Sequence, residues 1–276
     1  MPSINREYLK KLNSIEEKRF LDLHPKSGAL FEKAKGVMPG GVPMSWMAKW
    51  PGAYPVFVES AKGSHFTDVD GNKYIDFCLG DTGSMTGHSP AATVAAITEQ
   101  MKHGFTSMLP TEDAVIVSLE LANRFGLPLW QFTVTATDAN RHTIRYCRLI
   151  TGKSKIIVID KCYHGSVDET FATLDKDGNT IKREGNLGAP VDLDQTTRVV
   201  EFNDLAGMEA ALAKGDVAAI LMEPAMTNIG IVLPDDGYLK AVGELAKKYG
   251  AIWIIDETHT ISVGPGGMTA LHGLTP

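Results

Sequence analysis

The sequence predicts an α/β fold in which a mainly parallel sheet carries helices on both faces. From residue 130 onward, strand-like and helix-like patterns alternate, which is typical of strands joined by crossover helices. The run Ala251-Ile252-Trp253-Ile254-Ile255 is apolar throughout, as expected for a strand buried on both faces of such a sheet. The predicted strands are 130–135, 155–160, 198–202, 217–223 and 251–256, and the helices between them are 138–149, 205–214 and 238–249.

An N-terminal α+β segment precedes this alternation. Residues 6–38 are charged and compatible with helices, and they end at the Pro39-Gly40-Gly41 break. Alternating patterns predict short antiparallel strands at 56–59, 64–68 and 73–77, and Asp70-Gly71 marks a hairpin turn between the last two. Helical patterns follow at 90–103 and, opening with a capped start at Thr111, at 111–125. We predict an N-terminal segment over 1–85 and a large domain over 86–276.

Composition restricts the class of protein. The 276 residues are 43% hydrophobic and 22% charged, which is ordinary for a soluble globular protein. The net charge of −6 argues against nucleic-acid binding, and no apolar run reaches the length of a membrane span or a signal-peptide core. The three cysteines are widely spaced and form no CxxC, which is typical of reduced thiols. We therefore expect a cytoplasmic protein that has neither a nucleic acid nor a membrane as its partner.

Asp256 stands where the last predicted strand leaves the sheet. Open α/β sheets bind their ligands at the carboxyl ends of the strands. A buried carboxylate at that edge has to be paired or hydrogen-bonded, because an isolated buried charge is too unfavourable. A cationic group is therefore expected to face Asp256, and a pyridine-type cofactor supplies one.

The segment Thr135-Ala136-Thr137-Asp138 joins a predicted strand to a predicted helix. Small residues at such a turn let backbone N–H groups approach a phosphate at the positive end of the helix. Taken alone, a helix N-cap by Thr137 is the simpler interpretation. Neither a Walker P-loop nor a GxGxxG motif occurs in the sequence, which weakens nucleotide hydrolysis and NAD binding as functions.

Two further strand ends carry candidate residues. Tyr163 follows the strand that ends at Asp160 and could stack on a planar ligand, although a tyrosine packed in a turn is the alternative. Glu223 and Asp256 end neighbouring strands. A metal site formed by Asp256, Glu257, His259 and His272 competes with this interpretation, but no HxH, HExxH or CxxC spacing supports it, and we expect no metal.

Seven motifs, taken in order, resemble class III aminotransferases, and within them the subgroup of glutamate-1-semialdehyde 2,1-aminomutase. They are Pro39-Gly40-Gly41-Val42, Asp68-Val69-Asp70-Gly71-Asn72-Lys73-Tyr74-Ile75-Asp76, Gly87-His88-Ser89-Pro90, Ala136-Thr137-Asp138-Ala139-Asn140, Tyr163-His164-Gly165, Glu223-Pro224 and Asp256-Glu257. The resemblance covers about residues 30–276. It implies a pyridoxal-phosphate enzyme of fold type I that forms a homodimer with its active site at the subunit interface.

The resemblance also implies roles for individual residues. Asp256 would pair with the pyridinium nitrogen as the catalytic carboxylate, so that the ring acts as an electron sink. The implied cofactor-binding residues are Ala136 and Thr137 at the phosphate, Tyr163 stacked on the ring, His164 beside it, His259 near the phenolic oxygen and Glu223 at the edge of the site.

Departures from the family pattern concern the substrate and the cofactor linkage. The substrate-loop arginine of the aminomutase is absent from the segment around Trp46, and the tryptophan before its Gly-His motif is replaced by Asp81, so Trp46 and Asp81 are the expected substrate residues. Thr258 stands where the family usually has valine. No lysine follows Lys248, so the Schiff-base lysine is absent; we expect the chain to be the first part of a longer enzyme and to be inactive alone.

The expected function is amino transfer between an amino acid, with β-amino acids among the candidates, and a 2-oxo acid. Two alternatives remain at this point. One is intramolecular amino transfer of the aminomutase kind. The other is a non-catalytic protein that resembles an aminotransferase.

Overall fold

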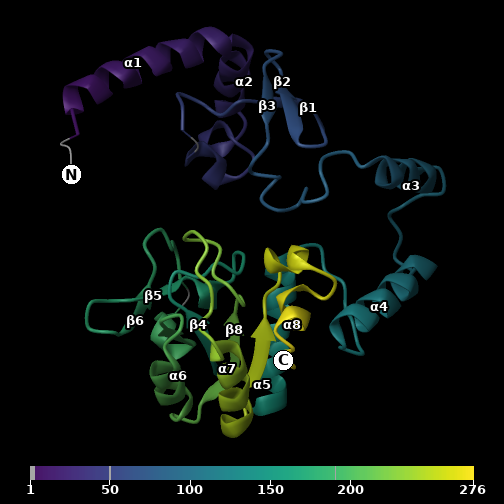
Figure 1. Ribbon diagram of the computed structural model, residues 1–276, viewed down its shortest axis with the longest axis vertical. Coiled ribbons are helices and arrows are strands. Elements are labelled where there is room, and N and C mark those ends of the chain that lie inside the picture. Colours follow the sequence, from purple (N-terminus) through teal and green to yellow (C-terminus); the bar gives the residue numbers. More distant parts are fainter. Residues whose placement is uncertain (1–3, 50, 190) are drawn as a thin grey trace. The chain divides into compact units, whose positions relative to one another are not determined.

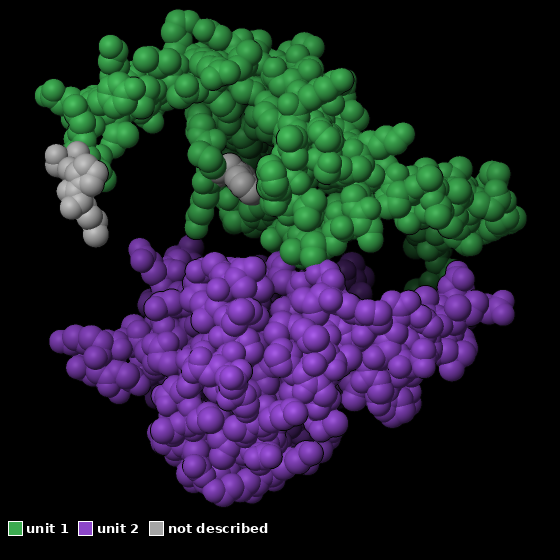
Figure 2. Space-filling view, viewed as in Figure 1, with its two compact units in different colours: residues 1–108 green, residues 109–276 purple. Residues whose placement is uncertain are grey.

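The computed structural model describes residues 4–49, 51–189 and 191–276. The chain divides into two compact units, residues 1–108 and 109–276 (Figure 2). The division after residue 85, expected from the sequence, stays a prediction.

The first unit combines helices with a small antiparallel sheet (Figure 1). Its elements are α1 (Arg6–Leu23), α2 (Pro25–Lys35), short 3₁₀ turns at Pro39–Gly41 and Ser45–Lys49, β1 (Val58–Lys62), β2 (His65–Asp68), β3 (Lys73–Ile75) and α3 (Ala91–Met101). The strand order is β1-β2-β3, and both pairings are antiparallel. The turn between β2 and β3 contains Gly71 at φ 91°, so the hairpin predicted at Asp70-Gly71 is confirmed.

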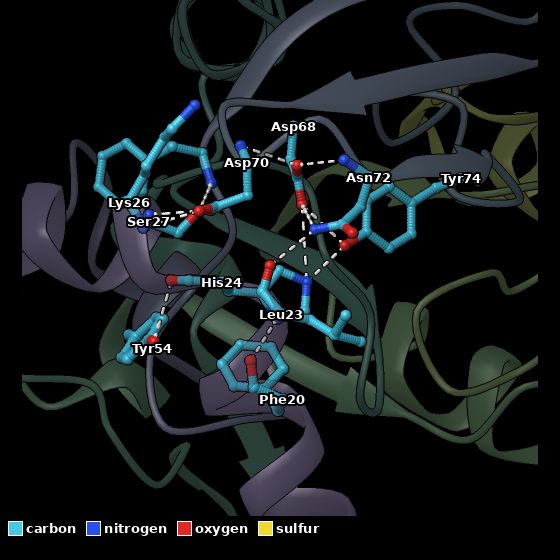
Figure 3. Close-up of polar contacts among 11 residues, drawn as sticks. Phe20, Leu23, His24, Lys26, Ser27, Tyr54, Asp68, Asp70, Asn72 and Tyr74 are labelled. Carbon is cyan, nitrogen blue, oxygen red and sulfur yellow. Dashed lines mark hydrogen bonds and ion pairs between the residues drawn. The ribbon is translucent and has the colours of Figure 1, made fainter.

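Two aspartates of this hairpin tie the sheet to the helices (Figure 3). Asp70 accepts hydrogen bonds from the backbone nitrogens of Lys26 and Ser27 at 2.7 and 3.0 Å, at the first turn of α2. Asp68 is completely buried and accepts from the Asp70 and Asn72 backbone nitrogens, from the Asn72 side chain and from the Tyr74 hydroxyl. The hairpin turn therefore supplies the N-terminal cap that α2 lacks from its own preceding residue.

The second unit is built on a four-stranded parallel sheet in the order β7-β4-β8-β9. Its elements are α4 (Glu112–Phe125), α5 (Ala136–Thr151), β4 (Lys155–Ile159), β5 (Ala172–Leu174), β6 (Thr180–Lys182), β7 (Thr197–Val200), α6 (Leu205–Leu212), β8 (Val217–Met222), α7 (Tyr238–Tyr249), β9 (Ile252–Ile255) and α8 (Gly267–Leu271), with 3₁₀ turns at Asp168–Thr170, Leu193–Gln195 and Thr260–Val263. The strands β5 and β6 form a separate antiparallel hairpin.

The core of the second unit lies around the two central strands. Every residue of β8 is buried, and so are the last four residues of β4. The helix α5 packs against β8, α6 against β7 and α7 against β9. This arrangement explains the apolar runs of the sequence, because strands covered by helices have no face left for solvent.

Residues 130–135 do not form the predicted strand. Val134 is 95% exposed, and among the described residues this segment pairs with no neighbouring strand. A β-propensity pattern becomes a strand only where a partner takes its backbone hydrogen bonds. The residue that caps α5 is Thr135 and not Thr137, since the Asp138 backbone nitrogen donates to the Thr135 hydroxyl at 3.1 Å. Thr111 precedes α4 as expected, but its side chain makes no capping hydrogen bond.

Within the described part of the chain, no helix has both the length and the apolar character that crossing a membrane requires.

Candidate active site

Asp256 is the centre of the candidate site. It follows β9 directly, and its backbone nitrogen donates to the Met222 carbonyl of β8 at 2.9 Å, which extends the sheet by one residue. Its carboxylate is only 7% exposed. The expectation that such a group is hydrogen-bonded is confirmed, because both of its oxygens accept hydrogen bonds from protein donors.

Four donors surround this carboxylate. On Oδ2, His164 Nδ1 lies at 2.9 Å and Asn140 Nδ2 at 3.1 Å. On Oδ1, the backbone nitrogen of Thr258 donates at 3.0 Å and its hydroxyl at 2.6 Å. Two carboxylate oxygens offer about four lone-pair positions, so these three side-chain donors and one backbone donor use all of them.

The electrostatics of Asp256 and His164 are linked. Burial alone would raise the pKa of Asp256, but the neighbouring His164 and the two Thr258 hydrogen bonds outweigh it and hold that pKa far below its usual range. Burial alone would lower the pKa of His164, but Cys162 and Asp256 outweigh it and raise that pKa. These shifts favour the protonated form of His164 and the charged form of Asp256, so each group stabilises the charge of the other away from bulk water.

The first turns of α5 lie beside Asp256 and His164. Asn140, one turn into this helix, donates to Asp256 Oδ2 and also to the His164 carbonyl, at 3.1 Å in both cases. Thr137 accepts a hydrogen bond from the Ser166 backbone nitrogen at 3.0 Å. The N-terminus of α5, the loop after β4 and the end of β9 therefore form one site.

Gly165 permits this close approach. It has φ +81°, and a Cβ at this position would lie 2.3 Å from the Thr137 hydroxyl oxygen. Only glycine combines that backbone conformation with so short a separation from the neighbouring helix.

The remaining candidate residues of the second unit lie around this centre. Tyr163 precedes His164 and is 44% exposed. Glu223 follows β8 and is buried; its Oε2 accepts from the Thr227 hydroxyl at 2.5 Å, whereas Oε1 is buried without a hydrogen-bond partner among the described atoms. Burial raises the pKa of Glu223, and His164, Asp256 and His259 all influence it electrostatically. His259 is therefore close enough to Glu223 to act on it electrostatically.

Glu257 has a different task from its neighbour Asp256. Its carboxylate accepts from the backbone nitrogens of Met268 and Thr269, and from the hydroxyls of Thr260 and Thr269. It thus caps the start of α8. In the described ranges no group of three potential metal-ligating side chains occurs.

The two expected substrate residues belong to the first unit. Trp46 lies in the 3₁₀ turn Ser45–Lys49 and is 42% exposed. Asp81 lies in a turn with φ 55°. Their roles stay predictions, since they and the Asp256 site belong to different units.

Sequence reasoning missed two donors of the site, Asn140 and Thr258. Asn140 is part of the motif at the start of α5, but the resemblance implies no role for its side chain. Thr258 departs from the family pattern, in which valine is usual at this position. A signal for both exists in retrospect, because each is a polar residue with a hydrogen-bond donor within about one turn of an assigned position.

The fold is that of the fold type I enzymes, to judge from the solved structures that it matches. A crystal structure of a glutamate-1-semialdehyde-aminomutase from Pseudomonas aeruginosa PAO1 superposes with a TM-score of 0.95 at 47% identity, and covers 99% of this chain and 60% of that one. A lysine-to-alanine variant of that enzyme in complex with PMP matches equally well. Glutamate-1-semialdehyde 2,1-aminomutase of Methanothrix thermoacetophila is 37% identical over 239 residues, which are 85% of this chain and 54% of that protein.

Residues 46–274 match the family described as aminotransferase class-III. The chain belongs to this family. It spans about 54–60% of the length of the relatives named above.

Proposed function

We propose that the protein is a pyridoxal-phosphate enzyme that transfers amino groups. The observation that carries this proposal is the Asp256 carboxylate, which is nearly buried, is kept anionic and lies at the end of a parallel strand. A cationic pyridinium nitrogen is the ligand group that such a carboxylate favours. When bound, the cofactor would supply an electron sink for the carbanion formed at the substrate.

The residues present fit both ends of this cofactor. The first N–H groups of α5 have no partner within the helix and form an anion site for the phosphate at Ala136 and Thr137. Asn140 links this helix to Asp256, so that one turn of α5 separates the proposed phosphate and ring-nitrogen positions. Tyr163 is half exposed in the loop between them, as a residue that stacks on the ring would be.

The side chains of this chain have distinct proposed tasks. Asp256 would bind the ring nitrogen and hold its proton in place. His164 and Asn140 orient the carboxylate and keep it charged. His259 would donate to the phenolic oxygen, and Glu223 would support the edge of the site.

Two forms of amino transfer are candidates. Transfer between an amino acid, a β-amino acid included, and a 2-oxo acid accords with the absence of the substrate-loop arginine around Trp46 and with Asp81 in place of tryptophan. Intramolecular transfer, as in glutamate-1-semialdehyde 2,1-aminomutase, has the stronger support, because the relatives at 37% and 47% identity bear that name. We further propose that the protein acts in the cytoplasm as a homodimer.

Binding of PMP tests the proposal, because PMP binds without a covalent bond to a lysine. Titration of the 276-residue chain with PMP, followed by calorimetry, should give saturable binding. Asp256→Asn should weaken that binding by about 10- to 100-fold, as expected for the loss of a charge-assisted hydrogen bond.

Asp160→Asn is the matched control. Asp160 also follows a parallel strand and is 5% exposed, but it accepts from Thr173 and Leu174 outside the site. It should leave PMP affinity unchanged. Equal affinity of the wild-type chain and the Asp256 variant would refute the role of Asp256, and absence of binding to the wild-type chain would refute the cofactor.

A further inference from the structure

The fully occupied carboxylate of Asp256 raises a question about how a cofactor binds there. This inference rests on the proposed function. A pyridinium N–H would be a fifth donor to a carboxylate whose four lone-pair positions are already taken by Asn140, His164 and Thr258. One of the four present donors therefore has to yield its position.

The four donors differ in how easily they can move. His164 and Asn140 are 1% and 7% exposed, and Asn140 also holds the His164 carbonyl. The Thr258 backbone nitrogen is fixed by the turn that it forms with Asp256. The Thr258 hydroxyl differs from these three, because its residue is exposed and because an O–H rotates about a single bond.

After the Thr258 hydroxyl leaves Asp256, it can form a hydrogen bond with water, because Thr258 is exposed. A buried donor that lost Asp256 would remain unsatisfied, which is unfavourable, whereas an exposed hydroxyl exchanges one acceptor for another. The Thr258 hydroxyl is thus the donor whose release from Oδ1 has the smallest free-energy cost.

We propose that Thr258 is a positioning residue whose hydroxyl holds Oδ1 of Asp256 in the cofactor-free protein and gives this position up to the ring nitrogen of the cofactor. Thr258 then stabilises the Asp256 carboxylate when no cofactor is bound, and competes with the cofactor for the same lone pair. It lowers cofactor affinity in the same proportion as it stabilises the cofactor-free carboxylate.

Removing the hydroxyl should therefore tighten binding. Thr258→Val should bind PMP about three- to tenfold more tightly than the wild-type chain, the equivalent of one exposed hydrogen bond. Thr258→Ser, which keeps the hydroxyl, should bind as the wild-type chain does. Without PMP, Thr258→Val should unfold at a lower urea concentration than the wild-type chain, and saturating PMP should reduce that difference.

Thr173→Val is the matched control. Thr173 donates its hydroxyl to Asp160 Oδ1 at 2.6 Å, the distance found between Thr258 and Asp256, and lies outside the site. This variant should lose stability without any change in PMP affinity. Thr258→Ala, which also lacks the hydroxyl, provides an independent second measurement of the effect at Thr258.

The outcomes separate this inference from the proposed function. If the wild-type chain binds PMP and Thr258→Val and Thr258→Ala bind it equally well or more weakly, the competition is refuted and the proposed function stands. If the wild-type chain and both variants fail to bind PMP, the proposed function fails and the inference fails with it. Tighter binding by both variants supports the inference.

Discussion

Gly165 illustrates how a single residue sets the spacing of the site. Its φ of +81° places the chain in the left-handed region, and a Cβ would overlap with the Thr137 hydroxyl. Gly165→Ala should destabilise the second unit by about 2–4 kcal/mol, since backbone strain and steric overlap add. Urea unfolding at neutral pH measures this loss.

Gly178→Ala isolates the backbone contribution. Gly178 has nearly the same φ, +80°, but no atom lies within 4 Å of a Cβ placed there. This control should cost only about 1–2 kcal/mol. Equal losses in the two variants would mean that the loop relaxes away from Thr137, contrary to our expectation.

Whether a site residue could be predicted depends on whether its role follows from the local sequence or from tertiary packing. Asp256 and Glu223 follow directly from apolar runs that end in an acid, because a strand end is visible in the sequence. Asn140 is different: its role requires that α5 packs on the sheet with one particular face toward Asp256, and that packing is a tertiary property. The local sequence does not reveal the role of Glu257 either, because the helix that it caps, α8, begins ten residues later.

At the scale of elements, α2 and the β2–β3 hairpin are stabilised as a pair. The apolar core of the second unit has no counterpart of similar size here, since the buried apolar residues described in the first unit are Ala34 and Val42. Polar contacts therefore carry much of the packing: Asp70 accepts hydrogen bonds from the first turn of α2, and Asp68 holds together the hairpin turn that carries Asp70 (Figure 3).

Asp68 should make this packing sensitive to acid. Burial would raise the pKa of Asp68, but its hydrogen bonds from Asn72 and Tyr74 outweigh it and lower that pKa. A carboxylate with a lowered pKa stabilises the folded state at pH values above its ordinary pKa of about 3.9, and loses this effect as the pH falls toward the folded-state pKa. The first unit should therefore lose stability below about pH 4.

Asp68→Asn tests this expectation. At pH 7 the variant should be less stable by about 1–3 kcal/mol, because an amide leaves some of the facing donors unpaired. The difference from the wild-type chain should shrink as the pH falls below about 4, because Asp68 is protonated more readily in the unfolded chain than in the folded one, where its pKa is lowered. Thermal unfolding at pH 7, 5 and 3 measures both effects, and Asp22→Asn, on the exposed face of α1, is the control. A difference that does not vary with pH would contradict the assignment to the Asp68 charge.

The elements themselves were largely predictable from local patterns. The helices α3 to α7 and the strands β4, β7, β8 and β9 lie within a few residues of their predicted bounds, because apolar periodicity and glycine breaks are local signals. The short helix α8 was not predicted. Residues 130–135 show the limit of local signals. Phe132 and Val134 have strand propensity, yet they form no strand, and 52% and 95% of their surfaces are exposed. A strand depends on its neighbours, and a local pattern does not contain them.

At the scale of the whole molecule, the two units differ in how they are stabilised. The main cluster of buried apolar residues runs from Ile144 to Leu274 and so belongs entirely to the second unit. The segment 102–111 between α3 and α4 is exposed throughout. Because proteases cut exposed, irregular chain first, this segment should be the earliest site of cleavage.

Limited digestion with chymotrypsin should therefore cut first near Phe105, which is 75% exposed. Intact mass spectrometry should find a resistant product that begins between residues 106 and 112 and ends at Pro276, while the first unit is degraded further, because it has little apolar core. Phe105→Ser should slow the first cut without changing the stability of the second unit. Early cleavage within 155–222 would show that the parallel sheet is not the most stable part of the chain, and would contradict this account.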